Sequence, residues 1–177
     1  MQFNFKTHGH IDISSLKDKA LAYTETDWKN YDFRQRTFKV HEQTNTIPLI
    51  WDEKLMAEPK VYDEFKKYIT ELNDICLLLT NNIGPGSLAT AMLVNLFSKK
   101  EIIRHKDSHK YFEIIHRIHI PIVTDPKCVF EIDGEVKHLP EGAVVEINNN
   151  NKPHSVKNNS NIDRVHLLID WLDKEEE

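Results

Sequence analysis

Two residues of one short segment and one distant histidine could together hold a metal ion. The segment is His105-Lys106-Asp107, and the histidine is His154. Residues two apart in a strand point to the same face, so the side chains of His105 and Asp107 would project together, and His154 would arrive from a neighbouring strand. Two imidazoles and one carboxylate occupy one face of an octahedral ion and leave the other positions open, which is the ligand set of non-heme Fe(II) oxygenases.

A single arginine could complete such a site. Arg164 follows His154 by ten residues and begins an apolar run that continues to Trp171. A buried guanidinium without a partner is costly, so Arg164 is expected either at a rim or paired, with Asp163 or Asp170 as possible protein partners. Because a guanidinium can grip a carboxylate through two parallel hydrogen bonds, Arg164 would suit a dicarboxylate cosubstrate near an open iron site.

The H-x-D spacing is weak when taken alone, because the chain contains ten histidines and a second copy, His10-Ile11-Asp12. That copy lies where apolar alternation is poor, and no paired histidine and arginine follow it at matching spacing. We interpret His8, His10 and Asp12 as solvated polar residues. The second constellation falls inside a succession of short β-type segments.

Several elements between Met92 and Trp171 resemble, in the same order, the aspartyl/asparaginyl β-hydroxylase family of Fe(II)/2-oxoglutarate-dependent oxygenases, and together they cover about half the chain. These elements are His105-x-Asp107, Arg117-Ile118-His119-Ile120-Pro121-Ile122, Glu141-Gly142-Ala143-Val144-Val145, His154-Ser155-Val156-x-Asn158 and Arg164-Val165-His166-Leu167-Leu168-Ile169-Asp170.

The resemblance implies an iron site beside a 2-oxoglutarate site. The implied iron ligands are His105, Asp107 and His154. The residues implied at the cosubstrate are Arg164, Arg117 and His119. The family often has a serine on the strand before H-x-D, and Asn95 is the nearest polar residue there.

The resemblance also implies that variable N-terminal elements help to cover the mouth of the barrel. On that analogy the basic segment containing Arg34 and Arg36 could meet an acidic substrate, although such a run is more often a solvated strand face. The implied reaction consumes O2 and 2-oxoglutarate, releases succinate and CO2, and hydroxylates an amino-acid C–H bond. The target would be an Asp or Asn side chain in a peptide, or a free amino acid such as proline.

Two other functional classes remain open from the sequence. A cupin-like metal enzyme that does not use 2-oxoglutarate could share the barrel, and Arg164 would then be structural or would bind substrate. A non-enzymatic jelly-roll module with a binding or structural role would hold no stoichiometric metal. The sequence leaves the oligomeric state open.

The predicted fold is mainly β with flanking helices: a double-stranded β-helix (jelly roll, cupin-like) core packed against a long helix. We expect one domain over 1–177, with a helical and variable part at 1–83 and the β-helix core at 84–172. In the first part we expect a helix from Ser14 or Ser15 to about Tyr23, strands near 37–40 and 47–51, and an amphipathic helix between 59 and 81. In the core we expect strands near 88–97, 102–107, 114–123, 128–132, 135–138, 143–147, 154–158 and 164–172, with a hairpin turn at Asp133-Gly134 and a polar loop at 148–151.

Composition narrows the setting. The formal charge of −5 disfavours nonspecific binding to nucleic acid, which needs lysine and arginine against phosphate. The 177 residues contain no run of ~18 apolar residues, so we expect no membrane partner, and the N-terminus lacks the apolar core of a signal peptide. We interpret Cys76 and Cys128 as small core residues of a cytoplasmic protein.

Overall fold

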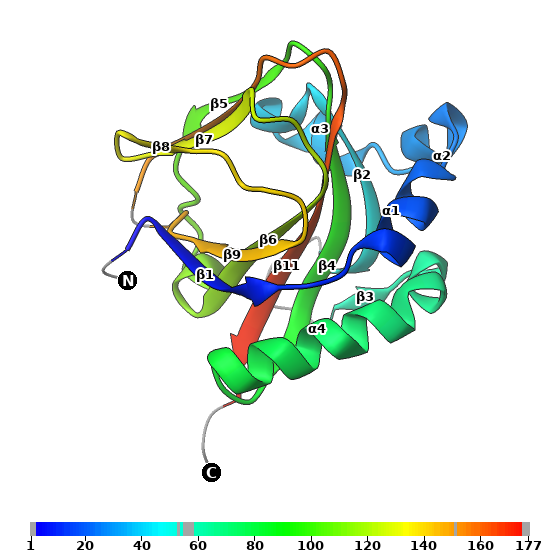
Figure 1. The fold of residues 1–177 in the computed structure, drawn as a ribbon, viewed down its shortest axis with the longest axis vertical. Coiled ribbons are helices and arrows are strands. Elements are labelled where there is room, and N and C mark those ends of the chain that lie inside the picture. The colour runs from blue at the N-terminus through cyan, green and yellow to red at the C-terminus, as the bar shows by residue number, and fades with distance from the viewer. Residues whose placement is uncertain (1–2, 53, 55–58, 151, 175–177) are drawn as a thin grey trace.

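The computed structural model describes residues 3–52, 54, 59–150 and 152–174, and Figure 1 shows their arrangement. Strands dominate, and the helices gather in the first half of the chain. The elements in chain order are β1 (Phe5–His10), α1 (Ser14–Leu21), α2 (Glu25–Lys29), α3 (Phe33–Thr37), the 3-10 turn η1 (Lys39–His41), β2 (Thr44–Trp51), β3 (Lys60–Val61), η2 (Asp63–Tyr68), α4 (Ile69–Asn82), β4 (Gly86–Leu96), β5 (Glu101–His105), η3 (Lys110–Glu113), β6 (Ile115–Val123), β7 (Cys128–Ile132), β8 (Glu135–Lys137), β9 (Ala143–Ile147), β10 (His154–Asn158) and β11 (Arg164–Asp173).

The strands form two antiparallel sheets. The larger has the order β1-β9-β6-β11-β4-β2-β3, and the smaller has the order β5-β10-β7-β8. A shared apolar cluster joins their inner faces, with Phe130 of β7 and Val156 of β10 packed among residues of β4 and β9. The predicted jelly-roll core is therefore confirmed, and its larger sheet also takes in strands from the first 83 residues.

Alternation along the central strand β11 separates two environments. Val165, Leu167, Ile169 and Trp171 belong to the cluster that packs beneath the helices, whereas the residues between them turn toward the barrel interior. On the outer side, α4 lies across the sheet (Figure 1) and buries three side chains in the same cluster, namely Leu72, Ile75 and Leu79. The predicted packing of a long helix against the outer face of a sheet is thus observed.

Some local expectations were accurate and others were wrong. Asp133 and Gly134 have positive φ angles of 51° and 88° and form the tight turn between β7 and β8, as their sequence predicted. The stretch 37–40 is not a strand, because it ends α3 and begins η1. The amphipathic helix begins at Ile69 rather than near Pro59, since Val61 pairs with Ile50 as part of a short strand and a 3-10 segment follows.

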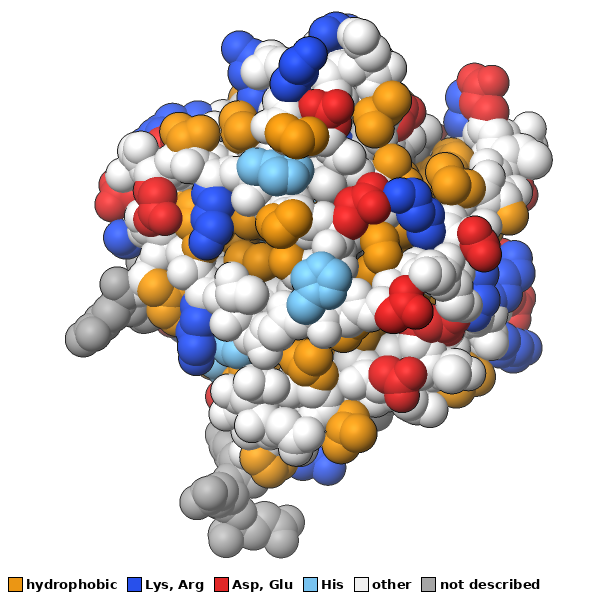
Figure 2. Space-filling view, viewed as in Figure 1, with side chains coloured by type: hydrophobic (Ala, Val, Ile, Leu, Met, Phe, Trp, Pro, Cys, Tyr) orange, Lys and Arg blue, Asp and Glu red, His pale blue; other side chains and the backbone are white. Residues whose placement is uncertain are grey.

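The N-terminal histidines also differ from the expectation. His8 is buried on β1, and its Nε2 lies 2.7 Å from a carboxylate oxygen of Glu146, while His10 and Asp12 are exposed. Cys76 is half-buried, Cys128 is buried, and neither forms a disulfide. Within the described part of the chain, no helix is long and apolar enough to cross a membrane. On the face drawn in Figure 2, acidic and basic side chains are interspersed.

Candidate metal and cosubstrate site

The structure brings His105, Asp107 and His154 together at the mouth of the barrel. One potential ligand atom of each lies within 4.8 Å of those of the other two. The proximity follows from strand pairing, because His105 at the end of β5 is the direct antiparallel partner of His154 at the start of β10. Asp107 follows β5, and its backbone N–H donates to the carbonyl oxygen of Asn149 at 3.2 Å. The three residues predicted as metal ligands therefore lie in a position to share one ion.

Hydrogen bonds to backbone carbonyls orient both imidazoles. Nδ1 of His105 lies 2.7 Å from the carbonyl oxygen of Ile103, and Nδ1 of His154 lies 3.3 Å from that of Lys152. A carbonyl oxygen can only accept, so Nδ1 is the donor in each ring and Nε2 is the nitrogen left for a metal ion. Burial lowers the pKa of His154 to about 4, so its ring is neutral at physiological pH and suited to metal ligation.

The carboxylate of Asp107 is held on one side and open on the other. Its Oδ2 accepts hydrogen bonds from Asn149 Nδ2 at 2.6 Å and from Arg117 Nη1 at 3.1 Å. Its Oδ1 lies 3.6 Å from Nε2 of His105. Burial alone would raise the pKa of Asp107, but the charge of Arg117 and the amide of Asn149 keep it below its usual range. The residue is therefore a carboxylate with one oxygen available to a cation.

Arg117, which we predicted at the cosubstrate, is bound to two carboxylates. Besides the bond to Asp107, its Nε and Nη2 donate to the two oxygens of Asp170 at 2.8 and 2.9 Å. Asp170 is 1% exposed and also accepts from the hydroxyl of Tyr111 at 2.9 Å, which in turn lies 3.1 Å from the hydroxyl of Thr90. These bonds use three of the five N–H donors of the guanidinium, and one N–H on each of Nη1 and Nη2 is left for another ligand.

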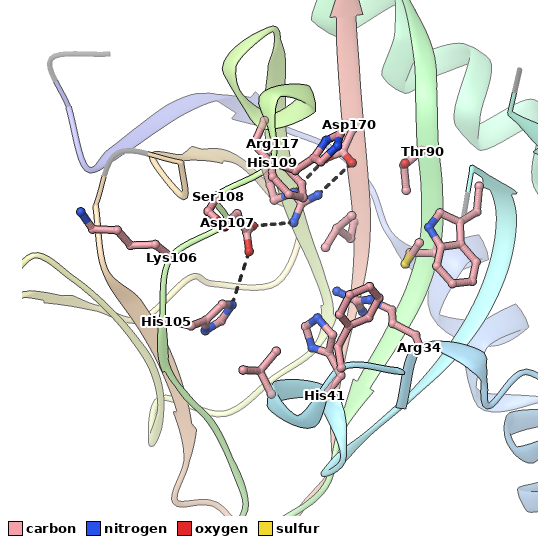
Figure 3. A pocket seen from close by; sticks show the side chains of 16 residues that line it. Arg34, His41, Thr90, His105, Lys106, Asp107, Ser108, His109, Arg117 and Asp170 are labelled. Carbon is pink, nitrogen blue, oxygen red and sulfur yellow. Dashed lines mark hydrogen bonds and ion pairs between the residues drawn. The ribbon is translucent and has the colours of Figure 1, made fainter. Parts of the chain in front are cut away.

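A cavity of about 370 Å³ opens beside this network (Figure 3). His105 and Asp107 lie on one side of it, and Arg34 and His41 reach in from the N-terminal segment on the other. A smaller cavity of about 40 Å³ continues inward from the same residues. The residues that line only the inner cavity are Val94, Ile102, His119, Phe130, Ile147, His154, Val156 and Arg164.

Arg164 lies at this inner cavity with most of its hydrogen-bonding capacity unused. The side chain is 2% exposed, and its Nε and Nη1 have no hydrogen-bond partner among the described residues. Asp163 and Asp170, the two partners considered from the sequence, bind Asn95 and Arg117 instead. Burial lowers the pKa of the guanidinium, which nevertheless remains charged near neutrality because an arginine starts from so high a value. A buried, charged fork without a counter-ion is suited to an anionic ligand.

Two neutral histidines lie near this fork. His119 lines the inner cavity, and its Nδ1 lies 3.5 Å from that of His166, whose Nε2 is buried without a partner among the described residues. Burial, together with the charge of Arg164, lowers the pKa of both rings well below the usual value. His119 therefore shares the inner cavity with Arg164, and His166 is a buried histidine of the barrel interior.

The remaining predicted residues separate into those that reach the cavity and those that do not. Arg34 lines both cavities, but Arg36 is exposed and pairs with Asp32 at 3.0 Å. Asn95 does not reach the site. Successive side chains of β4 point to opposite faces, and Val94 lines the inner cavity, so Asn95 points to the other face, where its amide donates to Asp163 at 3.0 Å.

Sequence reasoning missed part of the site. The stretch 148–151 was expected to be a polar loop, yet Asn149 is 1% exposed and holds Asp107. Asp170, interpreted as a structural strand end, anchors Arg117. Asp170 and Arg164 lie an even number of residues apart in one strand, which indicates that both side chains face the barrel interior. The sequence does not show that β6, which carries Arg117, is the neighbouring strand.

Several solved structures share this fold. A Pseudomonas putida prolyl-4-hydroxylase matches 98% of this chain and 95% of its own at 11% identity and a TM-score of 0.61. AviO1 from Streptomyces viridochromogenes matches 98% and 91% at 14% identity and 0.60. An oxidoreductase of the 2OG-Fe(II) oxygenase family from Burkholderia pseudomallei matches 73% and 67% at 12% identity and 0.57. At these identities the likeness concerns the fold.

The family follows from the sequence itself. The sequence model described as aspartyl/asparaginyl β-hydroxylase matches residues 9–174, which is nearly the whole chain. The chain therefore belongs to the aspartyl/asparaginyl β-hydroxylase family, as the motifs between Met92 and Trp171 indicated. A search of curated proteins finds no match.

Proposed function

We propose that the protein is an Fe(II)/2-oxoglutarate-dependent dioxygenase that hydroxylates an amino-acid C–H bond and releases succinate and CO2. His105, Asp107 and His154 would hold the iron, since their donor atoms converge and match the ligand preference of a non-heme Fe(II) site. When bound, the iron and 2-oxoglutarate supply the oxidising chemistry, and the protein contributes ligation, orientation and exclusion of water.

The observation that carries this proposal is the state of Arg164. Its guanidinium is 2% exposed and keeps Nε and Nη1 without partners, beside an inner cavity that also reaches the three candidate ligands. Leaving such donors buried and unpaired is costly, so a bound carboxylate is the natural partner. We assign this role to the distal carboxylate of 2-oxoglutarate. In a metal enzyme that did not use 2-oxoglutarate, the same fork would need an anionic substrate as its partner.

The other residues would organise the site. The carbonyls of Ile103 and Lys152 fix the two imidazoles, and Asn149 and Arg117 fix the carboxylate of Asp107, so each ligand is oriented before an ion binds. His119, neutral and close to Arg164, would donate to or accept from the cosubstrate without adding charge. The target would be an amino acid, either free or within a peptide.

Succinate formation tests the proposal. Purified protein supplied with Fe(II), ascorbate and 2-oxoglutarate should form succinate slowly in the absence of a substrate. A panel of amino acids and peptides should contain at least one substrate that makes succinate formation faster. Asp107→Ala should abolish this activity. His10→Ala is a matched control, because it alters the exposed second H-x-D copy. The assignment of the metal site would be contradicted if Asp107→Ala kept its activity, or if His10→Ala lost activity as well.

A further inference from the structure

The outer cavity contains a cation that the proposed iron and cosubstrate do not use. Arg34 lines both cavities, and its Nη1 is buried without a hydrogen-bond partner. Among the described residues no carboxylate forms an ion pair with it. The charges of Arg117, Asp107 and Asp170 act on it through space, and burial with the charge of Arg117 lowers the pKa of Arg34 to about 10, which leaves it charged at neutral pH.

The position of Arg34 is fixed by its neighbours in α3. Phe33 packs edge-on against Trp51 with ring centroids 5.6 Å apart, and the amide of Gln35 donates to the hydroxyls of Thr44 and Thr46 at 3.3 and 3.0 Å. These contacts attach the short helix to β2 and turn Arg34 toward the cavity, as Figure 3 shows. Arg34, one of the two arginines expected to meet an acidic substrate, therefore lines the cavity, whereas Arg36 is exposed.

A count of the charges around the two cavities indicates that Arg34 lacks a negatively charged partner. Arg34, Arg117 and Arg164 together carry three positive charges at the two cavities, whereas Asp107 and Asp170, both paired with Arg117, carry two negative ones. A divalent ion and the dicarboxylate 2-oxoglutarate would offset one another. One positive charge is then left over, and Arg34 is the cation without an ion pair. Lys106 is not counted, because its exposed side chain points away from the cavity in Figure 3.

The wall around Arg34 is mostly apolar. Trp51, Met92 and Leu168 are buried and line the same cavity, and Phe38, the residue that follows α3, also lines it. A ligand for this space therefore needs one anionic end and a hydrocarbon body of a few carbons. A cavity of about 370 Å³ is sufficient for a small molecule of this kind.

We propose that Arg34 binds the carboxylate of the substrate and that the substrate is a small free acid with an apolar body, a class that includes apolar amino acids and their N-acyl derivatives. This inference rests on the proposed function and narrows it from amino-acid units in general to free acids. The apolar side chains would hold the carbon skeleton in front of the candidate ligands, while Arg164 remains with the cosubstrate. Arg34 thus acts as a substrate-specificity residue.

The test uses simple probes on the complete protein loaded with Mn(II) and 2-oxoglutarate under anaerobic conditions. Calorimetry would compare butanoate, hexanoate and octanoate with their uncharged amides. Acids should bind more tightly than amides, and affinity should rise by up to about fourfold for each methylene that the apolar wall buries. Arg34→Gln should weaken acid binding by about ten- to a hundredfold while leaving amide binding unchanged.

Arg36→Gln is the matched control, because it removes the same charge from the exposed side of the same helix. It should leave acid binding unaltered. Acids bound no better than amides, or equal effects of the two substitutions, would overturn the inference. Binding of 2-oxoglutarate provides the second readout: an Arg34→Gln protein that loses 2-oxoglutarate would assign Arg34 to the cosubstrate instead. A wild type that binds no 2-oxoglutarate would refute the proposed function itself.

Discussion

Replacing Arg117 with methionine would separate its role in stability from its role in positioning a metal ligand. The substitution removes both hydrogen bonds to Asp170 and leaves that carboxylate, 1% exposed, with the hydroxyl of Tyr111 as its remaining partner. Breaking a buried ion pair by deleting one partner costs about 3–5 kcal/mol, because the other charge stays buried and uncompensated. Urea denaturation should therefore show a loss of this size for Arg117→Met.

The double variant Arg117→Met/Asp170→Leu removes the uncompensated charge together with its partner. Since apolar replacement of a buried ion pair is often neutral, most of the lost stability should return. Asp107 would still lack the bond from Arg117 and would keep that from Asn149. Loss of a hydrogen bond that orients a ligand typically weakens metal affinity by about 10–100-fold, so Mn(II) binding should remain impaired.

Electron paramagnetic resonance of free Mn(II) measures this affinity directly. The two readouts together decide whether Arg117 is a positioning residue or only a structural one. Wild-type Mn(II) affinity in the folded double variant would refute the reasoning, because it would show that Asp107 needs no support from Arg117. A single variant as stable as the wild type would equally contradict the account of Asp170.

Two further predictions concern stability away from the cavity. Glu146 is buried between His116 and His8; burial alone would raise its pKa, but these two imidazoles hold it at about 2, so its stabilising effect is present above pH 4.5 and is lost as the pH falls toward 2. Glu146→Gln should therefore lower the free energy of unfolding at pH 7 by about 2–3 kcal/mol, and the difference from wild type should shrink in denaturation curves recorded below pH 4.5; a difference independent of pH would contradict this. Gly142 has a φ of +78°, and an added Cβ would lie 2.6 Å from the backbone carbonyl oxygen of Ile11, so Gly142→Ala should lower the melting temperature more than Gly134→Ala, which has a similar φ of +88° but open space around it. Equal melting temperatures would contradict a cost from this backbone contact.

The parts of the fold predicted well from sequence are those governed by local patterns. The turn at Asp133-Gly134 needs two positive φ angles, and few residue pairs other than these accept them. The strands Cys128–Ile132 and Ala143–Ile147 were located correctly because each is a compact apolar run between turn residues. The predicted strand 102–107 ends at His105, so strand alternation does not place Asp107, which its bonds with Asn149 and Arg117 hold beside His105 instead.

The parts that failed depend on contacts distant in sequence. The short helix that carries Arg34 was not predicted, because its position depends on docking against β2 and five residues show no periodicity. Asn149 resembles any polar loop residue until Asp107 is placed beside it. Asn95 points away from the site because it is one residue from an inward-facing position, and adjacent residues in a strand point to opposite faces.

The central claim is that three converging ligands and the vacant fork of Arg164 form one site for a metal ion and 2-oxoglutarate. Calorimetric titration of 2-oxoglutarate into the protein, with and without Mn(II), tests it most directly. We predict one equivalent bound with Mn(II), much weaker binding without it, and about tenfold or greater weakening in Arg164→Lys with Mn(II) affinity retained, because lysine keeps the charge but loses the two-pronged geometry. Tight Mn(II) binding without any binding of 2-oxoglutarate, or equal affinities in wild type and Arg164→Lys, would contradict the account.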